Sequence, residues 1–316
     1  MYKRTILVTG AAGFVPSSLI DKLLEDATTF VLGIDSMLTG KYKNLPQKAN
    51  FSFIKCDVND WQDISGVMLS TKFDFVFHYA AVVGVKRTLD NPLMVLEDIK
   101  GFENVLKLSK NTGVKRIFFS SSSEVYGEPV EFPQNELTTP LNSKLPYAIV
   151  KNIGEAYLKS YQHEHGLNYT IFRFFNTYGP KQSEDFVLSK FIKLAMQNKD
   201  IPVYGDGSQT RTFCYIDDNV SATLACLNEH KHENEVLNIG SPLEITIKEL
   251  ASLVIELTGS SSAILHLPPL KDGDMKRRQP DNTKMIDLLG RDIIPLREGI
   301  KRVLAAWQFV PVGEMV

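Results

Sequence analysis

The sequence predicts an α/β fold built on a doubly wound parallel sheet, followed by a smaller C-terminal α/β domain. Two observations carry this prediction. Short, continuous apolar runs alternate with helical patterns along the first half of the chain, and such runs are typical of parallel strands that are covered on both faces. A glycine-rich turn follows the first run directly, as at the first turn of many doubly wound sheets.

Six strands are expected in the first 180 residues. They cover 6–8, 30–34, 51–54, 75–77, 116–119 and 169–174. Helical spacing follows the first strand over 17–24, a longer helical pattern over 92–112 ends at Gly113, and another helix is expected over 147–165. Because strands and helices alternate, neighbouring strands should run parallel to one another.

The character of the chain changes after Gly179 and Pro180. Helical patterns cover 186–198, 218–227 and 247–257, a strand is expected over 235–239, and turn-rich stretches lie at 204–207 and 267–269. We therefore expect a sheet domain over 1–180 and mainly a second domain over 181–316, with segments near 213–240 returning to the sheet.

The composition is that of a globular protein, and it excludes several function classes. The 316 residues are 43% hydrophobic and 23% charged, with a formal net charge of −2, which argues against the basic surface of a nucleic-acid-binding protein. The three cysteines are widely spaced, so we expect neither a disulfide framework nor a metal site. No apolar run is long enough for a membrane span or a signal peptide, and we expect a cytoplasmic protein.

The turn over residues 9–16 has the chemistry of a phosphate-binding loop. Gly10 and Gly13 follow a strand and open a helix, so that backbone N–H groups near Phe14 and Val15 could approach a diphosphate. Asp35 ends the second strand, 25 residues after Gly10. A carboxylate there accepts hydrogen bonds from a ribose diol and repels a 2′-phosphate, which favours NAD over NADP.

Pro16 departs from the pattern, which has a third glycine at this position. A proline is tolerated in the first helical turn, where its missing N–H would have no intrahelical partner. Its ring is bulkier than a glycine where helix, strand and cofactor meet. We expect cofactor binding to survive, in a weakened or shifted form.

A second group of residues suggests acid–base chemistry. Tyr147 and Lys151 are four residues apart, which places them on one face of a helix. A nearby cation lowers the pKa of a phenol from about 10, so this Tyr could remove a proton from a sugar hydroxyl. The run from Ser120 to Ser123, with Glu124 after it, follows the fifth strand, at the edge where doubly wound sheets bind ligands.

These motifs together resemble the extended short-chain dehydrogenases/reductases of the nucleotide-sugar epimerase, dehydratase and decarboxylase group, which share a Rossmann sheet. The resemblance covers nearly the whole chain, in the order TGAAGF, GIDSMLTG, CDVND, HYAA, SSSSEVYG, PYAIVK, FRFFNTYGP, YGDGSQTRTFCYIDD, LNIG and GDMKRRQPD.

The resemblance implies roles for individual residues. It implies NAD as the cofactor, a nucleotide sugar (most simply UDP-linked) as the substrate, and a catalytic Ser122 with Tyr147 and Lys151. Tyr147 and Lys151 are implied to contact the cofactor as well. The remaining implied cofactor contacts are Asp57 and Val58 beside the adenine, with Tyr79, Ala80 and Ala81 along the cofactor; the implied substrate contacts are Ser123, Asn176, Arg211 and Arg278.

The resemblance also implies an assembly and a cellular role. Related proteins form homodimers through the helices that correspond to 92–112 and 147–165. Both helices carry apolar positions beyond the needs of one sheet face, such as Val105, Leu108, Ile153 and Tyr157, so an isologous four-helix contact is expected. Enzymes of this group supply precursors of surface polysaccharides.

The reaction itself stays open among several candidates. All share oxidation of the hexose at C4, after which the 4-keto sugar is re-reduced (epimerase), loses water (dehydratase) or loses CO2 (decarboxylase). Glu124 is similar to the residue of decarboxylases and GDP-mannose dehydratases, and Ser123 stands where UDP-glucose-type and dTDP-glucose-type dehydratases have Asp. The Pro146-Tyr147-Ala148 context resembles epimerases and GDP-mannose dehydratases more than decarboxylases. We expect a UDP-sugar 4-epimerase first, with UDP-glucuronate decarboxylase or 4,6-dehydratase as alternatives. An NAD-binding scaffold or sensor is the non-enzyme alternative.

Overall fold

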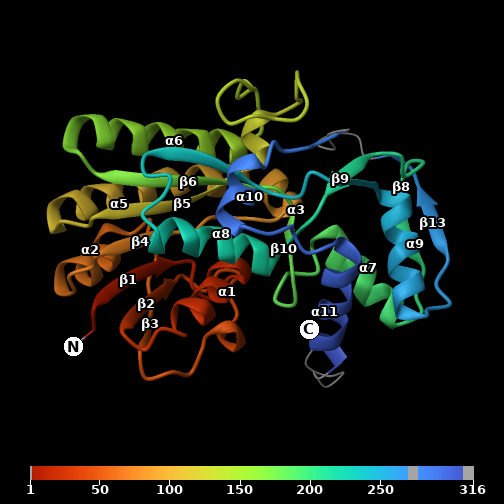
Figure 1. Cartoon of the computed structure of the whole chain (residues 1–316), viewed down its shortest axis with the longest axis horizontal. Coiled ribbons are helices and arrows are strands. Elements are labelled where there is room, and N and C mark those ends of the chain that lie inside the picture. The colour runs from red at the N-terminus through yellow and green to blue at the C-terminus, as the bar shows by residue number, and fades with distance from the viewer. Residues whose placement is uncertain (1, 270–276, 309–316) are drawn as a thin grey trace. The chain divides into compact units, whose positions relative to one another are not determined.

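The computed structural model describes residues 2–269 and 277–308, and its central feature is a seven-stranded sheet (Figure 1). In spatial order the strands are β11 (Glu235–Ile239), β6 (Asn168–Phe174), β5 (Arg116–Ser122), β4 (Phe75–His78), β1 (Arg4–Thr9), β2 (Thr29–Asp35) and β3 (Phe51–Lys55). Every strand pair from β3 to β6 is parallel. The predicted fold class is confirmed, and each of the seven predicted strands lies in this sheet.

The strand order reverses between β1 and β4. From β1 the chain proceeds to β2 and β3 on one side, whereas β4, β5 and β6 follow on the other. In a doubly wound sheet, this switch point opens a crevice at the carboxyl ends of the two strands, and ligands bind there. The glycine-rich turn follows β1 and the residues 79–81 follow β4, so the fold brings both predicted cofactor segments to this crevice.

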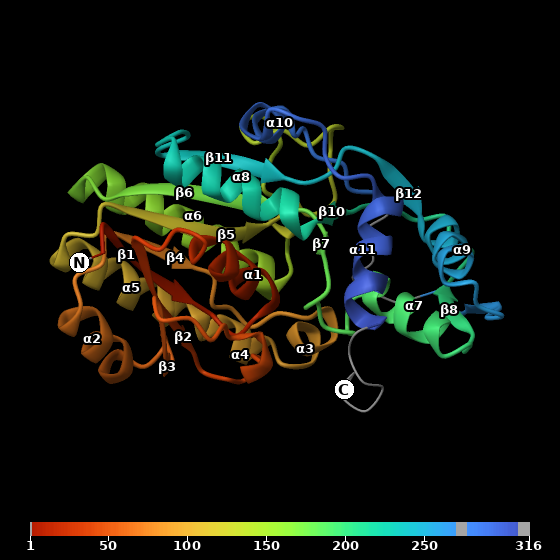
Figure 2. The same cartoon turned by 60° about the horizontal axis from the view of Figure 1, so that its bottom comes forward.

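Helices cover both faces of the sheet (Figures 1 and 2). Those that belong with the sheet are α1 (Phe14–Leu23), α2 (Trp61–Ser70), α3 (Val85–Asp90), α4 (Pro92–Leu96), α5 (Asp98–Thr112), α6 (Pro146–His165) and most of α8 (Ile216–Asn228). Side chains from alternate strand positions, including Leu7, Val76, Ile117 and Ile171, form a buried apolar core with α2, α5 and α6. The residues between them point to the opposite face of the sheet. Because that face is buried as well, the strands are apolar along their whole length.

The single helix predicted over 92–112 is two helices. α4 ends at Leu96 and α5 begins at Asp98, with Glu97 between them. Glu97 has φ −63° and ψ −25°, so its backbone stays close to helical values although it belongs to neither helix. α5 ends at Gly113 in the left-handed conformation (φ 77°), as the sequence predicts, because glycine adopts this conformation without strain.

The chain divides into two compact units. The first comprises residues 1–127, 141–174 and 220–237, and the second comprises 128–140, 175–219 and 238–316. The second unit contains β7 (Thr177–Tyr178), α7 (Val187–Met196), β8 (Ile201–Tyr204), β9 (Thr210–Thr212), β10 (Cys214–Tyr215), β12 (Glu244–Thr246), α9 (Ile247–Thr258), β13 (Ile264–Leu267), α10 (Thr283–Leu289) and α11 (Leu296–Gln308), and α8 (Ile216–Asn228) begins in it. Its strands pair two by two, as β10–β7, β12–β9 and β13–β8.

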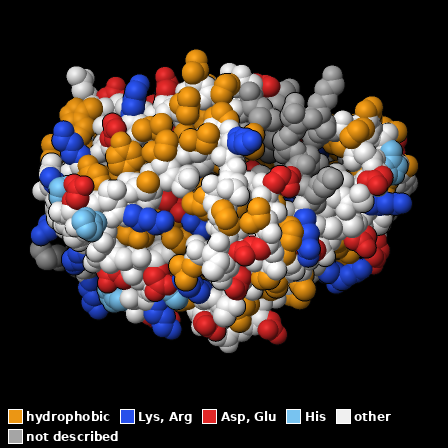
Figure 3. Space-filling model, turned by 90° about the horizontal axis from the view of Figure 1, so that it is seen from above, with side chains coloured by type: hydrophobic (Ala, Val, Ile, Leu, Met, Phe, Trp, Pro, Cys, Tyr) orange, Lys and Arg blue, Asp and Glu red, His pale blue; other side chains and the backbone are white. Residues whose placement is uncertain are grey.

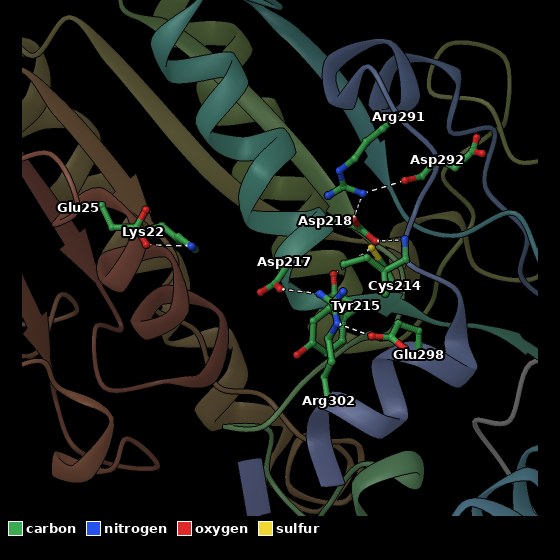
Figure 4. Close-up of polar contacts among 11 residues, drawn as sticks. Lys22, Glu25, Cys214, Tyr215, Asp217, Asp218, Arg291, Asp292, Glu298 and Arg302 are labelled. Carbon is green, nitrogen blue, oxygen red and sulfur yellow. Dashed lines mark hydrogen bonds and ion pairs between the residues drawn. The ribbon is translucent and has the colours of Figure 1, made fainter. Parts of the chain in front are cut away.

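Ion pairs fasten the C-terminal elements of the second unit (Figure 4). The buried carboxylate of Asp218 receives the Arg291 guanidinium at 2.7 Å and the backbone N–H of Ile294 at 2.8 Å. Arg302 on α11 lies between Asp217, at 3.4 Å, and Glu298, at 3.0 Å. Asp218 is almost fully buried, so its pair with Arg291 is screened far less by water than the exposed Arg302 pairs.

Among the helices that the structure describes, none has both the length and the apolar character of a membrane span.

Candidate active site

The glycine turn after β1 lies directly against the segment after β4. Gly10 has a φ of 71°, and a Cβ atom added to it would lie 2.9 Å from the Ala80 Cα. Such a distance is too short for any side chain, and a positive φ is strained for residues other than glycine. Glycine at this position therefore lets the turn and the residues 79–81 meet at the switch point, where the cofactor was predicted.

A buried threonine joins the same two strand ends. The Thr9 hydroxyl oxygen accepts hydrogen bonds from the backbone N–H groups of Tyr79, at 3.0 Å, and Ala80, at 2.9 Å. These two bonds occupy both lone pairs, so the hydroxyl proton is directed at His78 Nδ1, 3.0 Å away. Burial lowers the pKa of His78 to about 3, so the imidazole is neutral. Thr9 directly precedes Gly10, but no sequence motif predicts this role for it.

The start of α1 has the properties of an anion-binding site. Gly13 is the N-cap and contributes no side-chain hydrogen bond, and the first N–H groups of a helix have no partner within it. Phe14 and Val15 are the first two helical residues, and Pro16 is the third. Pro16 therefore removes no intrahelical hydrogen bond, but it also leaves one donor fewer for a diphosphate.

Asp35 is held in place beside the glycine turn. Its carboxylate accepts hydrogen bonds from the backbone N–H groups of Ala12, at 3.0 Å, and Met37, at 2.7 Å. Burial raises the pKa of this carboxyl, and the two backbone hydrogen bonds oppose that shift. A Cβ atom at Gly40 would lie only 2.8 Å from the carboxylate. The end of β2 thus presents a fixed acidic group to the crevice, as a ribose-binding residue requires.

Helix α5 fastens the loops that follow β3 and β4. Asn104 Nδ2 donates to the Val58 carbonyl at 2.9 Å, and Asn59, in the same loop as Asp57 and Val58, donates to Asp98 at 3.4 Å. Asp98 also accepts the Val82 N–H at 2.8 Å. Asp98 and Asn104 therefore position the predicted adenine-side and cofactor-side loops. The signal that could have revealed Asp98 is an acidic residue at a buried position of an otherwise apolar helix face.

The predicted catalytic serine ends β5. The Ser122 hydroxyl oxygen accepts the Glu124 N–H at 3.2 Å and so caps the short 3-10 helix Ser123–Tyr126. Ser123 is buried, and Glu124 is half-buried. The turn closes at Gly127, which has a φ of 64° and lies so close to Ser143 that a Cβ atom would be 2.7 Å from its backbone nitrogen. The serine and the carboxylate are thus set on one rigid turn at the carboxyl edge of the sheet.

Tyr147 and Lys151 stand on the first turns of α6, which packs against β5 and this turn. The Lys151 ammonium donates to the Ser120 carbonyl at 2.7 Å and lies 5.7 Å from the centre of the Tyr147 ring. Burial lowers the pKa of Lys151 to about 8, and Asp98 opposes that shift. The structure therefore brings Lys151 and Tyr147 to the end of β5, where Ser122 lies, and keeps the lysine mostly charged at neutral pH.

The buried lysine should make the stability of the protein depend on pH. In the unfolded chain its pKa returns to about 10.5, so above pH 8 the unfolded state binds the extra proton and the wild type gains stability as the pH rises. Methionine does not titrate, so the free energy of unfolding of the wild type should rise relative to that of Lys151→Met as the pH increases. Between pH 7 and pH 10 we expect this relative rise to be about 2 kcal/mol. Denaturant unfolding of both proteins across this range measures the difference. A pH-independent difference would contradict the lowered pKa.

Three of the four predicted substrate residues, Asn176, Arg211 and Arg278, lie in the second unit, whereas Ser123 lies in the first. Asn176, with a φ of 38°, donates from its amide to the Thr212 carbonyl at 3.0 Å and so lies beside β9, which carries Arg211. Glu244 joins β9 to the segment around Arg278, because it accepts hydrogen bonds from both Thr210 and Arg277 at 2.8 Å. Arg278 is buried. Residues 273–276 of the predicted motif over 273–281 lie outside the described residues.

The chain has a Rossmann sheet with a glycine turn at its switch point, and a Tyr–Lys pair at the end of the strand that bears Ser122. Together these features define an extended short-chain dehydrogenase/reductase. Comparison with known proteins agrees. The model of the NAD dependent epimerase/dehydratase family matches residues 6–240, and the chain belongs to this family. The protein is therefore an enzyme that uses NAD as its cofactor.

Relatives of known name cover nearly the whole chain. A UDP-glucose 4-epimerase from Mycolicibacterium smegmatis is 32% identical over 307 residues, which are 94% of this chain and 96% of that protein. A UDP-N-acetyl-alpha-D-glucosaminuronate decarboxylase from Bacillus cytotoxicus is 35% identical over 300 residues, 90% of this chain and 92% of that protein. The crystal structure of a Thermotoga maritima UDP-glucose 4-epimerase with UDP-glucose superposes with a TM-score of 0.90 at 34% identity, covering 96% of this chain and 98% of that one.

Proposed function

We propose that this protein is a UDP-sugar 4-epimerase that inverts the configuration at C4 of the hexose through a transient 4-keto sugar. The observation that carries the proposal is the placement of Tyr147 and Lys151, on α6, at the end of β5 that bears Ser122. Similarity to UDP-glucose 4-epimerases along almost the whole chain supports the choice of substrate.

The described residues fit NAD, judged by the close approach at Gly10 and the acidic group fixed at the end of β2. In the proposal, the helix start at Gly13, Phe14 and Val15 holds the diphosphate, Asp35 binds a ribose, and Asp57 and Val58 lie beside the adenine. Tyr79, Ala80 and Ala81 line the path between them. When bound, NAD supplies the two-electron acceptor that lets a carbon–hydrogen bond of the sugar be oxidised and then restored.

The protein's own side chains then handle one proton. Tyr147 removes the proton of the C4 hydroxyl as that carbon is oxidised, and Ser122 shares the hydrogen bond to the same oxygen. The charge of Lys151 stabilises the phenolate that carries Tyr147 into this step. On the return step Tyr147 gives the proton back, so the acid–base pair ends in its starting state.

The substrate residues are proposed from the second unit and from the turn after β5. A planar guanidinium suits phosphate oxygens, so we assign Arg211 and Arg278 to the nucleotide diphosphate, with Asn176 as a polar contact. Ser123 contributes from the turn that bears Ser122. A cytoplasmic location and a role in supplying polysaccharide precursors belong to the same proposal and rest on the resemblance alone.

Glu124 favours a second candidate, a decarboxylase or a 4,6-dehydratase, both of which are lyases. A carboxylate beside the 4-keto sugar could manage the additional proton that these reactions need, and the Bacillus cytotoxicus decarboxylase is among the relatives. A protein that only binds NAD, as a scaffold or sensor, would need no Ser122, Tyr147 and Lys151 set.

A panel of nucleotide sugars distinguishes these activities by product mass. The purified protein is incubated with UDP-glucose, UDP-glucuronate and dTDP-glucose, and the products are analysed by mass spectrometry and NMR. The proposal expects an unchanged mass and UDP-galactose as the product. Loss of CO2 would identify a decarboxylase and loss of water a dehydratase, whereas bound NAD with no conversion of any sugar would favour a sensor.

The variant Glu124→Gln separates the epimerase from the lyases. An epimerase moves a single proton, so we expect the rate to fall by less than about tenfold, which is about 1.4 kcal/mol of barrier. A lyase would lose about 10²–10⁴-fold and would accumulate NADH, because oxidation at C4 could proceed without the later step. Steady-state rates and absorbance at 340 nm measure both effects. Accumulated NADH in this variant would refute the epimerase assignment.

A homodimer through α5 and α6 is also proposed, with a correction to the residues. Val105 and Leu108 were expected to be available to a partner, but each is 1% exposed because it belongs to the core between α5 and the sheet. Ile153 and Tyr157 instead line an outward groove of about 360 Å³ along α6. Figure 3 looks onto the side of the molecule where α6 lies and shows hydrophobic side chains gathered there, as an isologous contact requires.

Sedimentation tests this assembly. We expect a dimer at micromolar concentration and a monomer for Ile153→Arg, because a charge in the centre of an apolar interface is costly to bury. The matched control is Leu69→Arg, which changes an exposed leucine on α2 and should remain dimeric. A monomeric wild type would contradict the proposed interface.

A further inference from the structure

A buried ion pair lies close to the proposed acid–base residues and takes no part in the proposed proton transfer. Arg173 on β6 donates from Nε to Glu155 Oε1 at 2.9 Å and from Nη2 to Oε2 at 2.7 Å. The side chains are only 2% and 1% exposed. A bidentate pair of this kind has a fixed geometry, so it holds α6 and β6 in one relative position.

The pair continues a series of contacts between α6 and β5. Lys151 donates to the Ser120 carbonyl at 2.7 Å, and the Ser121 hydroxyl donates to Glu155 Oε1 at 2.6 Å. Lys151 and Glu155 are one helical turn apart, and the two serines are consecutive on the strand. Two contacts in step fix the register of the helix against the strand. Tyr147 is then one turn further along α6, and Ser122 is the next residue of β5.

Arg173 also reaches the turn that carries the proposed site. Its Nη1 donates to the Tyr126 hydroxyl at 2.9 Å, and the guanidinium lies 4.8 Å from the centre of the Tyr126 ring. Tyr126 is fully buried and ends the 3-10 helix that contains Ser123 and Glu124. The same guanidinium therefore anchors α6 through Glu155 and the catalytic turn through Tyr126.

We propose that Glu155 and Arg173 are positioning residues, which set Tyr147 and Lys151 in register with Ser122 and hold the turn over residues 123–126. An apolar pair of similar volume could fill such a site without the cost of removing two charges from water, so directional contacts are the feature that the ion pair adds. The roles of Tyr147, Lys151 and Ser122 in this inference rest on the proposed function.

The test is the double variant Glu155→Met/Arg173→Met, which removes both charges of the pair, so that neither is left buried alone. Lys159, whose ammonium lies 3.9 Å from Glu155 Oε2, is half exposed and keeps its contact with water. We expect it to fold and bind NAD like the wild type, but to lose about 10- to 100-fold in kcat, since a displacement of about 1 Å between reacting groups has this effect. KM should stay within about twofold, because a shift of the acid–base pair acts on the chemical step more than on substrate binding.

The matched control is Arg116→Met, which removes the buried arginine at the opposite end of β5. Arg116 donates to the Cys226 and Lys231 carbonyls and stacks on Phe118. Its loss should lower stability and leave the kcat of the folded protein unchanged. A second variant, Tyr126→Phe, keeps the ion pair and the ring contact and removes the hydrogen bond from Arg173 to the Tyr126 hydroxyl. We therefore expect a smaller loss of kcat and no loss of fold.

Hydrogen exchange gives a readout that needs no substrate. Faster amide exchange over 121–127 in the double variant, or in Tyr126→Phe if the double variant does not fold, supports the positioning role, provided that Arg116→Met does not show it. Wild-type kcat together with wild-type exchange in a folded variant would overturn the inference. Should the wild type convert no nucleotide sugar, the proposed function fails, while the exchange experiment still decides the positioning role.

Discussion

Replacement of Tyr147 by Phe should reduce kcat by about 10²–10⁴-fold, the usual effect of losing a positioned acid–base group. The hydroxyl is the only part of the side chain that the variant lacks, and Lys151 lies 5.7 Å from the ring centre. Without the hydroxyl, nothing at this position removes the proton of the C4 hydroxyl, so oxidation at C4 is slowed. Product should form at the reduced rate with any nucleotide sugar, and NADH should not accumulate.

The control for this variant lies on the same helix. Tyr161 is also on α6 but faces the outward groove, so Tyr161→Phe should keep the wild-type rate. Calorimetric titration with NAD should give the same affinity for both variants, which shows that the cofactor site is intact. A Tyr147→Phe enzyme that keeps more than about a tenth of the wild-type kcat would remove Tyr147 from the mechanism.

Gly10→Ala should weaken NAD binding at least about tenfold. A residue with a Cβ atom at a φ of 71° is strained by about 1–3 kcal/mol, and about 1.4 kcal/mol corresponds to tenfold in affinity. The added atom would also meet the Ala80 Cα at 2.9 Å, so the turn and the segment after β4 must separate. The free energy of unfolding should fall by about 1–3 kcal/mol for the same reason.

Gly66→Ala provides the comparison. Gly66 lies within α2, and a Cβ atom there would meet nothing within 4 Å. Alanine has the higher helix propensity, so this variant should be at least as stable as the wild type and bind NAD equally well. Calorimetric titrations and thermal unfolding of the two variants measure these effects. Equal NAD affinities for Gly10→Ala and the wild type would show that the turn does not form the cofactor site.

The sheet could be predicted from the sequence because its strands are short and apolar on both faces. Each run, from 6–8 to 235–239, became a strand of the sheet. The interruption at Glu97 could not be predicted, since its backbone dihedrals remain near helical values and the apolar spacing continues across it. Val105 and Leu108 show the same limit, because helical spacing alone does not reveal which apolar face meets the sheet and which meets a partner.

Those site residues that stand in short motifs could also be predicted from the sequence. Those that act through contacts with distant parts of the chain could not. Gly10, Gly13, Tyr147 and Lys151 stand in short motifs whose spacing has a physical meaning. Thr9, Asp98 and the Glu155–Arg173 pair act through partners that are distant in sequence. Glu155 and Arg173, for example, are 18 residues apart and meet only because α6 packs on β6. Contacts of this kind depend on the register of the helix against the strand, and this register cannot be predicted from the spacing of apolar residues in the sequence.

The fate of the hydrogen atom at C4 tests the central claim most directly. Tyr147 handles only the hydroxyl proton, so in an epimerase the carbon-bound hydrogen leaves with its electron pair and returns to the same carbon without mixing with water. UDP-glucose labelled with deuterium at C4 is incubated with the enzyme in ordinary water, and the product is analysed by NMR. The account predicts UDP-galactose that retains the deuterium at C4. UDP-galactose with the label lost to water, or no inversion at C4, would contradict it.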